Sequence, residues 1–121
     1  GHETGDAVLV AVAAALRGSV RSRKEVFRMG GEEFLLLLPG ASRAGAAGRL
    51  EQIRRKISEA GSALQVPGLQ VTVSIGLAQW RPDQDDLAGL LRRADHAMYG
   101  AKRAGRDRVM DGEQLDAASP V

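Results

Sequence analysis

"RMGGEEFLLLLPG", residues 28–40, places two glycines and two glutamates directly before a phenylalanine and four leucines. The pair Gly30–Gly31 is typical of a two-residue turn, and Phe34–Leu38 is an apolar run closed by Pro39 and Gly40. The mixed segment Glu25–Met29 precedes the turn. This pattern predicts a β-hairpin whose second strand is covered on both faces.

The two glutamates, Glu32 and Glu33, stand at the mouth of that apolar run. Carboxylates beside a core need a cation, a cluster of donors or open solvent. Mg²⁺ commonly binds one or two carboxylates together with substrate phosphates and waters. Successive strand residues point to opposite sides, so both glutamates reach one ion only if the turn is distorted. The alternative is a plain hairpin whose glutamates keep a sheet edge soluble.

Two helices are expected on either side of the hairpin. Apolar residues recur at helical spacing over Asp6–Leu16, and Gly18 ends the run. Asp6 opens this helix, where a capping side chain is expected. Ser42 caps the second helix, and Gly61 is its expected stop. The inward stripe of that helix consists of Ala46, Leu50, Ile53, Ile57 and Ala60.

The second half of the chain predicts a strand followed by a helix. Bulky and small residues alternate over Leu69–Trp80, so one face of this strand should accept a helix closely. Asp85 or Asp86 caps the last long helix, Gly105 lies at its end, and a short strand follows around 108–110. The order describes an α+β sandwich of helices on a sheet, which lacks a strand at its start.

Length and charge restrict the function. The chain has 121 residues, a net charge of +2, 3% aromatic residues and no cysteine. It is long enough for one domain, expected over 1–110, with a loose tail over 111–121. The small charge and few aromatic residues argue against a nucleic-acid partner and favour a small anionic ligand. No apolar run approaches the ~20 residues of a membrane helix, and we expect a cytoplasmic protein.

A second candidate site lies at the end of the last helix. Lys102 and Arg106 are four residues apart, with Gly105 between them, so both should lie on one side of the helix end. Two cations there suit a triphosphate, which arginine binds through two nitrogens. The alternative is that they only complement the negative end of the helix dipole.

Four motifs together resemble a known family. They are GHETGD at 1–6, RMGGEEF at 28–34, VTVSIGLA at 71–78 and ADHAMYGAKRAGRDRV at 94–109. In this order they resemble the GGDEF domain of diguanylate cyclases, in its GGEEF form. The resemblance implies a ferredoxin-like, nucleotidyl-cyclase-like sandwich with an antiparallel-rich sheet. It also implies that a homodimer joins two GTP molecules into cyclic di-GMP with Mg²⁺ or Mn²⁺.

The resemblance assigns roles to the hairpin turn. Glu32 matches the acidic residue that binds metal and supports catalysis. Glu33 matches the second acidic residue, close to the metal and to the attacking 3′-hydroxyl. Gly30 and Gly31 match the turn under the GTP phosphates.

Other roles fall outside the turn. Asp6 matches the carboxylate that reads guanine through its N1 and N2 hydrogens, which suits a group that only accepts hydrogen bonds. Lys102 and Arg106 match the pair that holds the phosphates. The family's inhibitory product site, Arg-x-x-Asp, matches Arg21 and Lys24, so a cation replaces its aspartate and product inhibition is doubtful.

One departure concerns the start of the chain. The family's central first strand, with a metal-binding Asp, a Phe-Lys pair and a guanine-binding Asn, has no counterpart here, because residue 1 falls inside the Gly-His motif. We therefore expect this chain alone to be inactive. The alternative function is a degenerate GGDEF module that binds GTP or cyclic di-GMP, or dimerises, without turnover.

Overall fold

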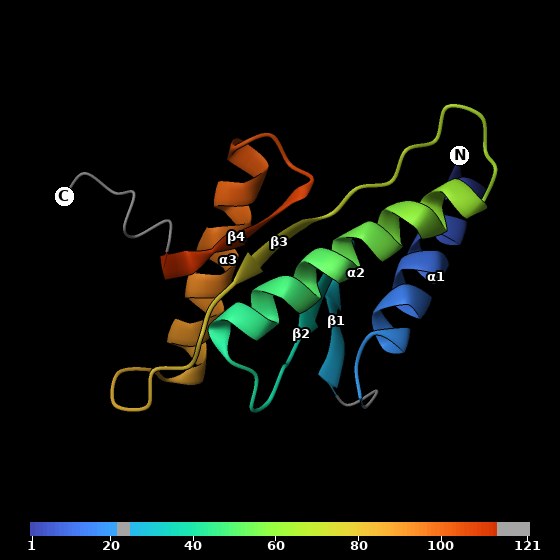
Figure 1. Cartoon of the computed structure of the whole chain (residues 1–121). Coiled ribbons are helices and arrows are strands. Elements are labelled where there is room, and N and C mark those ends of the chain that lie inside the picture. Colours follow the sequence, from blue (N-terminus) through green and yellow to red (C-terminus); the bar gives the residue numbers. More distant parts are fainter. Residues whose placement is uncertain (22–24, 114–121) are drawn as a thin grey trace.

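The computed structural model describes residues 1–21 and 25–113, which form an α+β fold, as expected. Figure 1 shows α2 running the length of the molecule, with α1 beside one end and α3, β3 and β4 at the other. No helix within these residues is both long and apolar enough to cross a bilayer. In chain order the elements are α1 (His2–Gly18), β1 (Val26–Gly30), β2 (Glu33–Leu36), α2 (Arg43–Ala63), β3 (Ser74–Leu77), α3 (Leu87–Arg103) and β4 (Arg108–Asp111).

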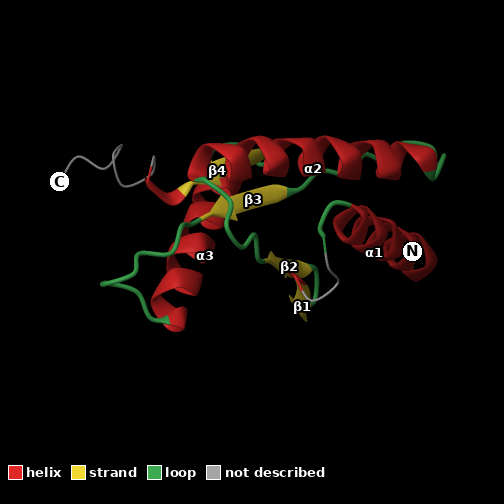
Figure 2. Cartoon of the chain, turned by 60° about the horizontal axis from the view of Figure 1, so that its bottom comes forward, coloured by secondary structure: helices red, strands yellow, loops and turns green. Residues whose placement is uncertain are grey.

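The strands of the described residues form two separate sheets of two strands each. β1 and β2 are the predicted antiparallel hairpin, and β3 and β4 pair in parallel. The parallel pairing follows from connectivity, because α3 carries the chain back across the sheet between β3 and β4. The expected single, antiparallel-rich sheet is therefore divided, and Figure 2 shows the hairpin apart from β3.

Helix α2 supplies most of the core. Four of its five predicted inward residues are buried, together with Leu16 of α1 and Leu77 of β3. The predicted cap is confirmed: the Ser42 hydroxyl accepts a hydrogen bond from the Gly45 amide at 3.0 Å. The predicted stop at Gly61 is wrong, because α2 continues to Ala63. A Cβ on Gly61 would lie 2.6 Å from the side chain of Val71, so this glycine allows close packing.

Two expected strands are shorter in the structure. The strand predicted over Leu69–Trp80 is hydrogen-bonded only as β3, because its partner β4 has four residues. Val71 and Val73 instead pack their side chains against the core without a strand partner in the described part of the chain. The second hairpin strand is half-buried rather than covered on both faces, and Leu37 beyond it is 39% exposed.

The last described residues, Asp111 and Glu113, are joined to α2 by ion pairs. The Arg43 guanidinium donates to Asp111 Oδ2 at 2.5 Å and forms an ion pair with Glu113. The hydrogen bond that Arg43 donates to Asp111 raises the pKa of Arg43, although desolvation opposes its charge. The described structure thus extends through Glu113, and the rest of the expected tail, 114–121, lies outside it.

The small face of β3 accepts α3, as the sequence predicts. A Cβ built on Gly76 would lie 2.2 Å from the Ala94 carbonyl oxygen and 2.3 Å from the Met98 nitrogen. Both atoms belong to the α3 backbone, which cannot rotate away as a side chain could. The contact between β3 and α3 therefore requires glycine at this position.

We predict that Gly76→Ala lowers the free energy of unfolding by about 3 kcal/mol or leaves the chain unfolded, because the added methyl overpacks a backbone contact. The matched control is Gly48→Ala on α2, where a Cβ meets no atom within 4 Å. That change should stabilise the chain by about 0.5–1 kcal/mol. Urea unfolding followed by circular dichroism measures both, and equal effects would contradict the packing of α3 on β3.

Candidate active site

The turn between β1 and β2 depends on two glycines with positive φ. Gly30 has a φ of 127° and Gly31 a φ of 52°. Gly30 ends β1 and pairs with Glu33, so the two turn residues are Gly31 and Glu32 rather than the predicted Gly30 and Gly31. A bulge between Arg28 and Gly30 shifts the register. A Cβ on either glycine would meet nothing within 4 Å, so backbone conformation rather than crowding favours glycine. The open surroundings leave the turn backbone accessible to a ligand.

Arg28 braces this turn from the first strand. Its Nε and Nη2 donate to the Gly31 carbonyl oxygen at 3.1 and 2.7 Å. The fork thereby fixes the peptide that precedes Glu32 and brings a positive charge to the turn. Sequence reasoning did not single out Arg28, although its place two residues before Gly30 was a usable signal.

The two glutamates of the motif project from the turn into solvent. Glu32 occupies the turn, Glu33 begins β2, and both residues are exposed. Neither side chain has a hydrogen bond or ion pair to any residue that the structure describes. No donor cluster of the described residues compensates these charges, and the exposure of both residues leaves their carboxylate oxygens available to a cation.

The carboxylates fit a metal ion only in part. Over residues 1–21 and 25–113, no group of three or more His, Cys, Asp or Glu side chains could hold a metal ion. Glu32 and Glu33 can supply two oxygen ligands, which suits Mg²⁺ or Mn²⁺ completed by phosphate oxygens and water. These donors therefore suit a metal bound with a nucleotide rather than a cage made by the protein alone.

Two of the other predicted site residues differ from their expected local structure. α1 begins at His2 with Gly1 as N-cap, so Asp6 lies inside the helix and does not cap it. α3 ends at Arg103, so Arg106 is not on a helical face with Lys102. Gly105 and Arg106 both have positive φ, and the Arg106 amide donates to the Ala101 carbonyl at 2.9 Å. The glycine ends the helix before the second cation.

The candidate residues come from separate parts of the molecule. Asp6 belongs to α1 and Lys102 to α3, and Figure 1 shows these helices on opposite sides of the hairpin. A cavity of about 290 Å³ between α1 and the hairpin is lined by Leu9, Val10, Arg17 and Phe34 among others, and it includes neither Asp6 nor the glutamates. Arg21 is exposed, and Lys24 lies outside the described residues.

The family model described as "Diguanylate cyclase, GGDEF domain" matches residues 1–108. The chain belongs to this family. Diguanylate cyclase A of Treponema denticola is 35% identical over 109 residues, which are 90% of this chain and 29% of that protein. Diguanylate cyclase DgcM of Escherichia coli K12 is 40% identical over 111 residues, which are 91% and 26%. This chain thus spans less than a third of either relative.

Solved GGDEF domains have the same fold. The GGDEF domain of DgcB from Caulobacter crescentus, in complex with c-di-GMP, matches with a TM-score of 0.81 at 34% identity, over 93% of this chain and 67% of that one. The active GGEEF domain of a diguanylate cyclase from Vibrio cholerae matches with a TM-score of 0.74 at 31% identity, over 92% and 70%. The expected nucleotidyl-cyclase-like fold is confirmed.

We predict that Arg28→Met loosens the GGEEF turn, because it removes both hydrogen bonds to the Gly31 carbonyl and keeps an unbranched side chain. Hydrogen exchange at the Gly31 and Glu32 amides should become faster. The free energy of unfolding should fall by no more than about 1 kcal/mol, since these hydrogen bonds are exposed. Arg55→Met on α2 is the control, and unchanged exchange at the turn in both variants would contradict this role for Arg28.

Proposed function

We propose that this chain is the catalytic part of a diguanylate cyclase that converts two GTP molecules into cyclic di-GMP and two pyrophosphates. In each of two steps, a 3′-oxygen forms a bond to the α-phosphorus of the other nucleotide, and the bond from that phosphorus to pyrophosphate breaks. The observation that carries the proposal is the open Gly30–Gly31 turn, followed by two accessible carboxylates at the GGEEF motif of a GGDEF domain.

Each motif residue has a chemical task in this proposal. Glu32 binds the divalent ion and supports catalysis, and Glu33 lies close to the metal and the attacking 3′-hydroxyl. Bound Mg²⁺ or Mn²⁺ supplies charge neutralisation on the reacting phosphate oxygens. Gly30 and Gly31 let the phosphates approach the backbone, because a Cβ on either glycine would meet nothing within 4 Å.

Three further residues complete the binding of GTP. Asp6, exposed on α1, accepts the N1 and N2 hydrogens of guanine. Lys102, in the last turn of α3, and the exposed Arg106 hold the phosphates. Two copies of the domain each present one GTP, and the reaction takes place in the cytoplasm. Structures of the DgcB GGDEF domain from Caulobacter crescentus in complex with c-di-GMP support this ligand class.

We also infer that the chain alone is inactive. No ladder of hydrogen bonds joins the hairpin to the sheet of β3 and β4 among the described residues. The glutamates therefore belong to one sheet, and Lys102 belongs to α3, which packs on the other. Phosphoryl transfer depends on holding the reacting groups in line, and small misplacements are costly. Turnover therefore requires an added strand that fixes the hairpin against β3.

We predict that cyclic di-GMP accumulates with GTP and Mg²⁺ or Mn²⁺ only when the chain is produced with its natural upstream sequence. In that longer protein, Glu32→Ala should lower turnover by at least about a hundredfold, because the metal loses a ligand at the reacting phosphate. Glu59→Ala, an exposed glutamate of α2, is the matched control. Product is followed by chromatography, and equal turnover of the wild type and Glu32→Ala would contradict the proposal.

We also predict that Mn²⁺ binds at the turn in the presence of a non-hydrolysable GTP analogue. Paramagnetic broadening should be strongest for the amides of residues 30–33, because the metal is held by the two glutamates. The double change Glu32→Gln and Glu33→Gln should abolish this broadening, while Glu59→Gln leaves it unchanged. Broadening centred elsewhere on the chain would contradict the metal assignment.

The second candidate function is a GGDEF module that binds GTP or cyclic di-GMP, or serves for dimerisation, without turnover. It is favoured by the small number of carboxylates at the turn. Among the described residues, Glu32 and Glu33 offer two metal ligands at most. Lys24, in place of an aspartate, argues against product binding next to Arg21. Nucleotide binding by the longer protein without turnover would decide for this function.

A further inference from the structure

The connection from α3 to β4 contains three consecutive residues with positive φ, and one of them is a predicted phosphate-binding cation. Gly105 has a φ of 122°, Arg106 a φ of 64° and Asp107 a φ of 47°. Glycine adopts such angles freely, but other L-residues do so at a cost, because their Cβ then lies close to a carbonyl oxygen. Backbone strain of this kind persists only where neighbouring groups hold it, and it is concentrated at functional sites.

Two local hydrogen bonds hold the backbone at Arg106. The Arg106 amide donates to the Ala101 carbonyl at 2.9 Å, and Arg108 Nε donates to the Arg106 carbonyl at 2.9 Å. The side chain of Arg106 is exposed, and it forms no hydrogen bond or ion pair within residues 1–21 and 25–113. Its guanidinium is therefore available to a ligand, although its backbone is fixed.

A third contact reaches this connection from α2, which is distant in sequence. Arg54 Nη1 donates to Asp107 Oδ1 at 2.6 Å. Glu51, one turn earlier on α2, orients the same guanidinium: it accepts from Arg54 Nε at 3.0 Å and forms an ion pair with Nη2. The side chain of Arg54 is 20% exposed and that of Asp107 is 46% exposed, so the ion pair is only partly shielded from solvent.

The guanidinium of Arg54 is held in its charged form. The hydrogen bonds that it donates to Glu51 and Asp107 raise the pKa of Arg54, although desolvation opposes its charge. The hydrogen bond from Arg54 likewise lowers the pKa of Glu51. Because the planar guanidinium directs each N–H, the contact with Asp107 fixes direction as well as distance.

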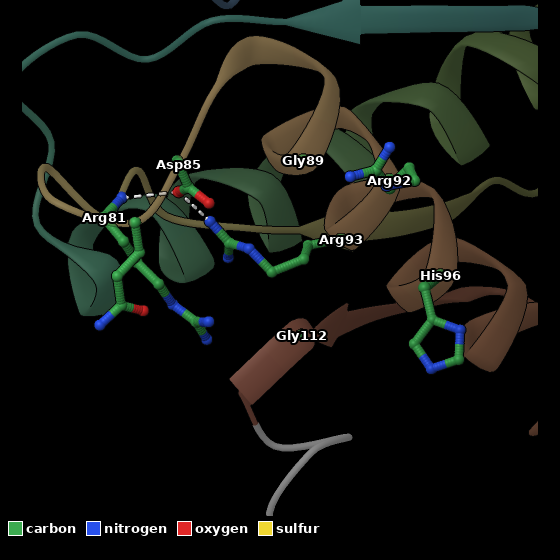
Figure 3. A pocket seen from close by; sticks show the side chains of 8 residues that line it. Arg81, Asp85, Gly89, Arg92, Arg93, His96 and Gly112 are labelled. Atoms are coloured by element: carbon green, nitrogen blue, oxygen red, sulfur yellow. Dashed lines mark hydrogen bonds and ion pairs between the residues drawn. The ribbon is translucent and has the colours of Figure 1, made fainter.

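The other end of α3 is held by a separate ion pair, which Figure 3 shows. Arg93 pairs with Asp85 in the loop before α3, and its Nη2 also donates to the Gln79 carbonyl at 2.8 Å. Its side chain is 21% exposed, almost the same as that of Arg54. The start of α3 is thus fixed without Arg54, which acts at the opposite end of the helix, next to Arg106.

We propose that Arg54 is a positioning residue of the GTP site: through Asp107 it holds the strained connection in the conformation that presents Arg106 to the phosphates. This role rests on the proposed function, in which Arg106 binds those phosphates. Arg54 need not touch the substrate, because its effect passes through the placement of Arg106. A cation that is already placed loses less conformational freedom on binding, and this favours affinity.

The first test is hydrogen exchange of the chain followed by two-dimensional NMR, with the slowest amides of α2 as the reference for global unfolding. Arg54→Gln should speed exchange of the Arg106 amide about tenfold, because the connection opens more often. Arg54→Lys keeps the charge but not the planar fork, and should give a smaller increase. The matched control Arg93→Gln should leave this exchange unchanged, and Arg55→Gln, at the next position of α2, is a second control.

The second test is the affinity of the longer protein, produced with its natural upstream sequence, for a non-hydrolysable GTP analogue, measured by calorimetry. Arg54→Gln should weaken binding about tenfold when Arg106 is present. The same change should have no effect in the background of Arg106→Met, because the positioned cation is then absent. Equal weakening in both backgrounds would overturn the positioning role in favour of a general loss of structure.

Two further results separate this role from the proposed function. Unchanged exchange of the Arg106 amide in Arg54→Gln would overturn the role of Arg54, whether or not the longer protein makes cyclic di-GMP. Binding of the analogue that Arg106→Met leaves unchanged would overturn the assignment of Arg106 to the phosphates, and with it the role of Arg54 in the GTP site.

Discussion

The apolar stripe of α2 holds together parts of the molecule that no sheet joins. Its buried residues contact α1 on one side and β3 and β4 on the other, while β1 and β2 add Val26, Phe34 and Leu36 to the same cluster. Ile53 and Ile57 are each 1% exposed, and they are the largest fully buried side chains described. Burying such side chains typically contributes about 1.5–3 kcal/mol each. Apolar packing, which is not directional, thus joins the elements that strand pairing would join in a continuous sheet.

This arrangement affects the geometry of the candidate active site. Packing of apolar side chains fixes the distance between two elements better than the angle between them, because it lacks the directionality of a ladder of hydrogen bonds. The GGEEF hairpin is attached to the core by a few half-buried side chains of one face. Its glutamates are therefore held firmly relative to Arg28 and the turn, but less firmly relative to Lys102, which α3 carries on the far side of β3. The turn and its glutamates are thus formed, but their position relative to Lys102 depends on what fixes the two sheets relative to each other.

Much of this fold follows from short-range chemistry that a sequence displays. The stripe of α2, the capping side chains of Ser42 and Asp86, and the small face of β3 at Gly76 all obey local rules of spacing and hydrogen bonding. The glycine motif likewise predicted the turn between β1 and β2. The sequence signals of these features each lie within a short segment of the chain.

The expectations that differ from the structure depend on partners distant in sequence. Gly61 was predicted to end the helix, but it instead allows close contact with Val71. The strand predicted over Leu69–Trp80 is paired only over the length that β4 can match. Arg106 leaves the helical face because Gly105 ends the helix early.

The free strand edges offer a way to position the glutamates relative to Lys102. Among the described residues, β2 pairs only with β1 and β3 only with β4, so each keeps one edge of unpaired backbone groups. Such edges are templates for another strand. A strand that bonded to both would fix the angle of the hairpin relative to α3, and with it the direction in which Glu32 and Glu33 face Lys102. The same hydrogen bonds would then complete the sheet and align the groups that we propose bind GTP, so folding and the proposed activity would be gained together.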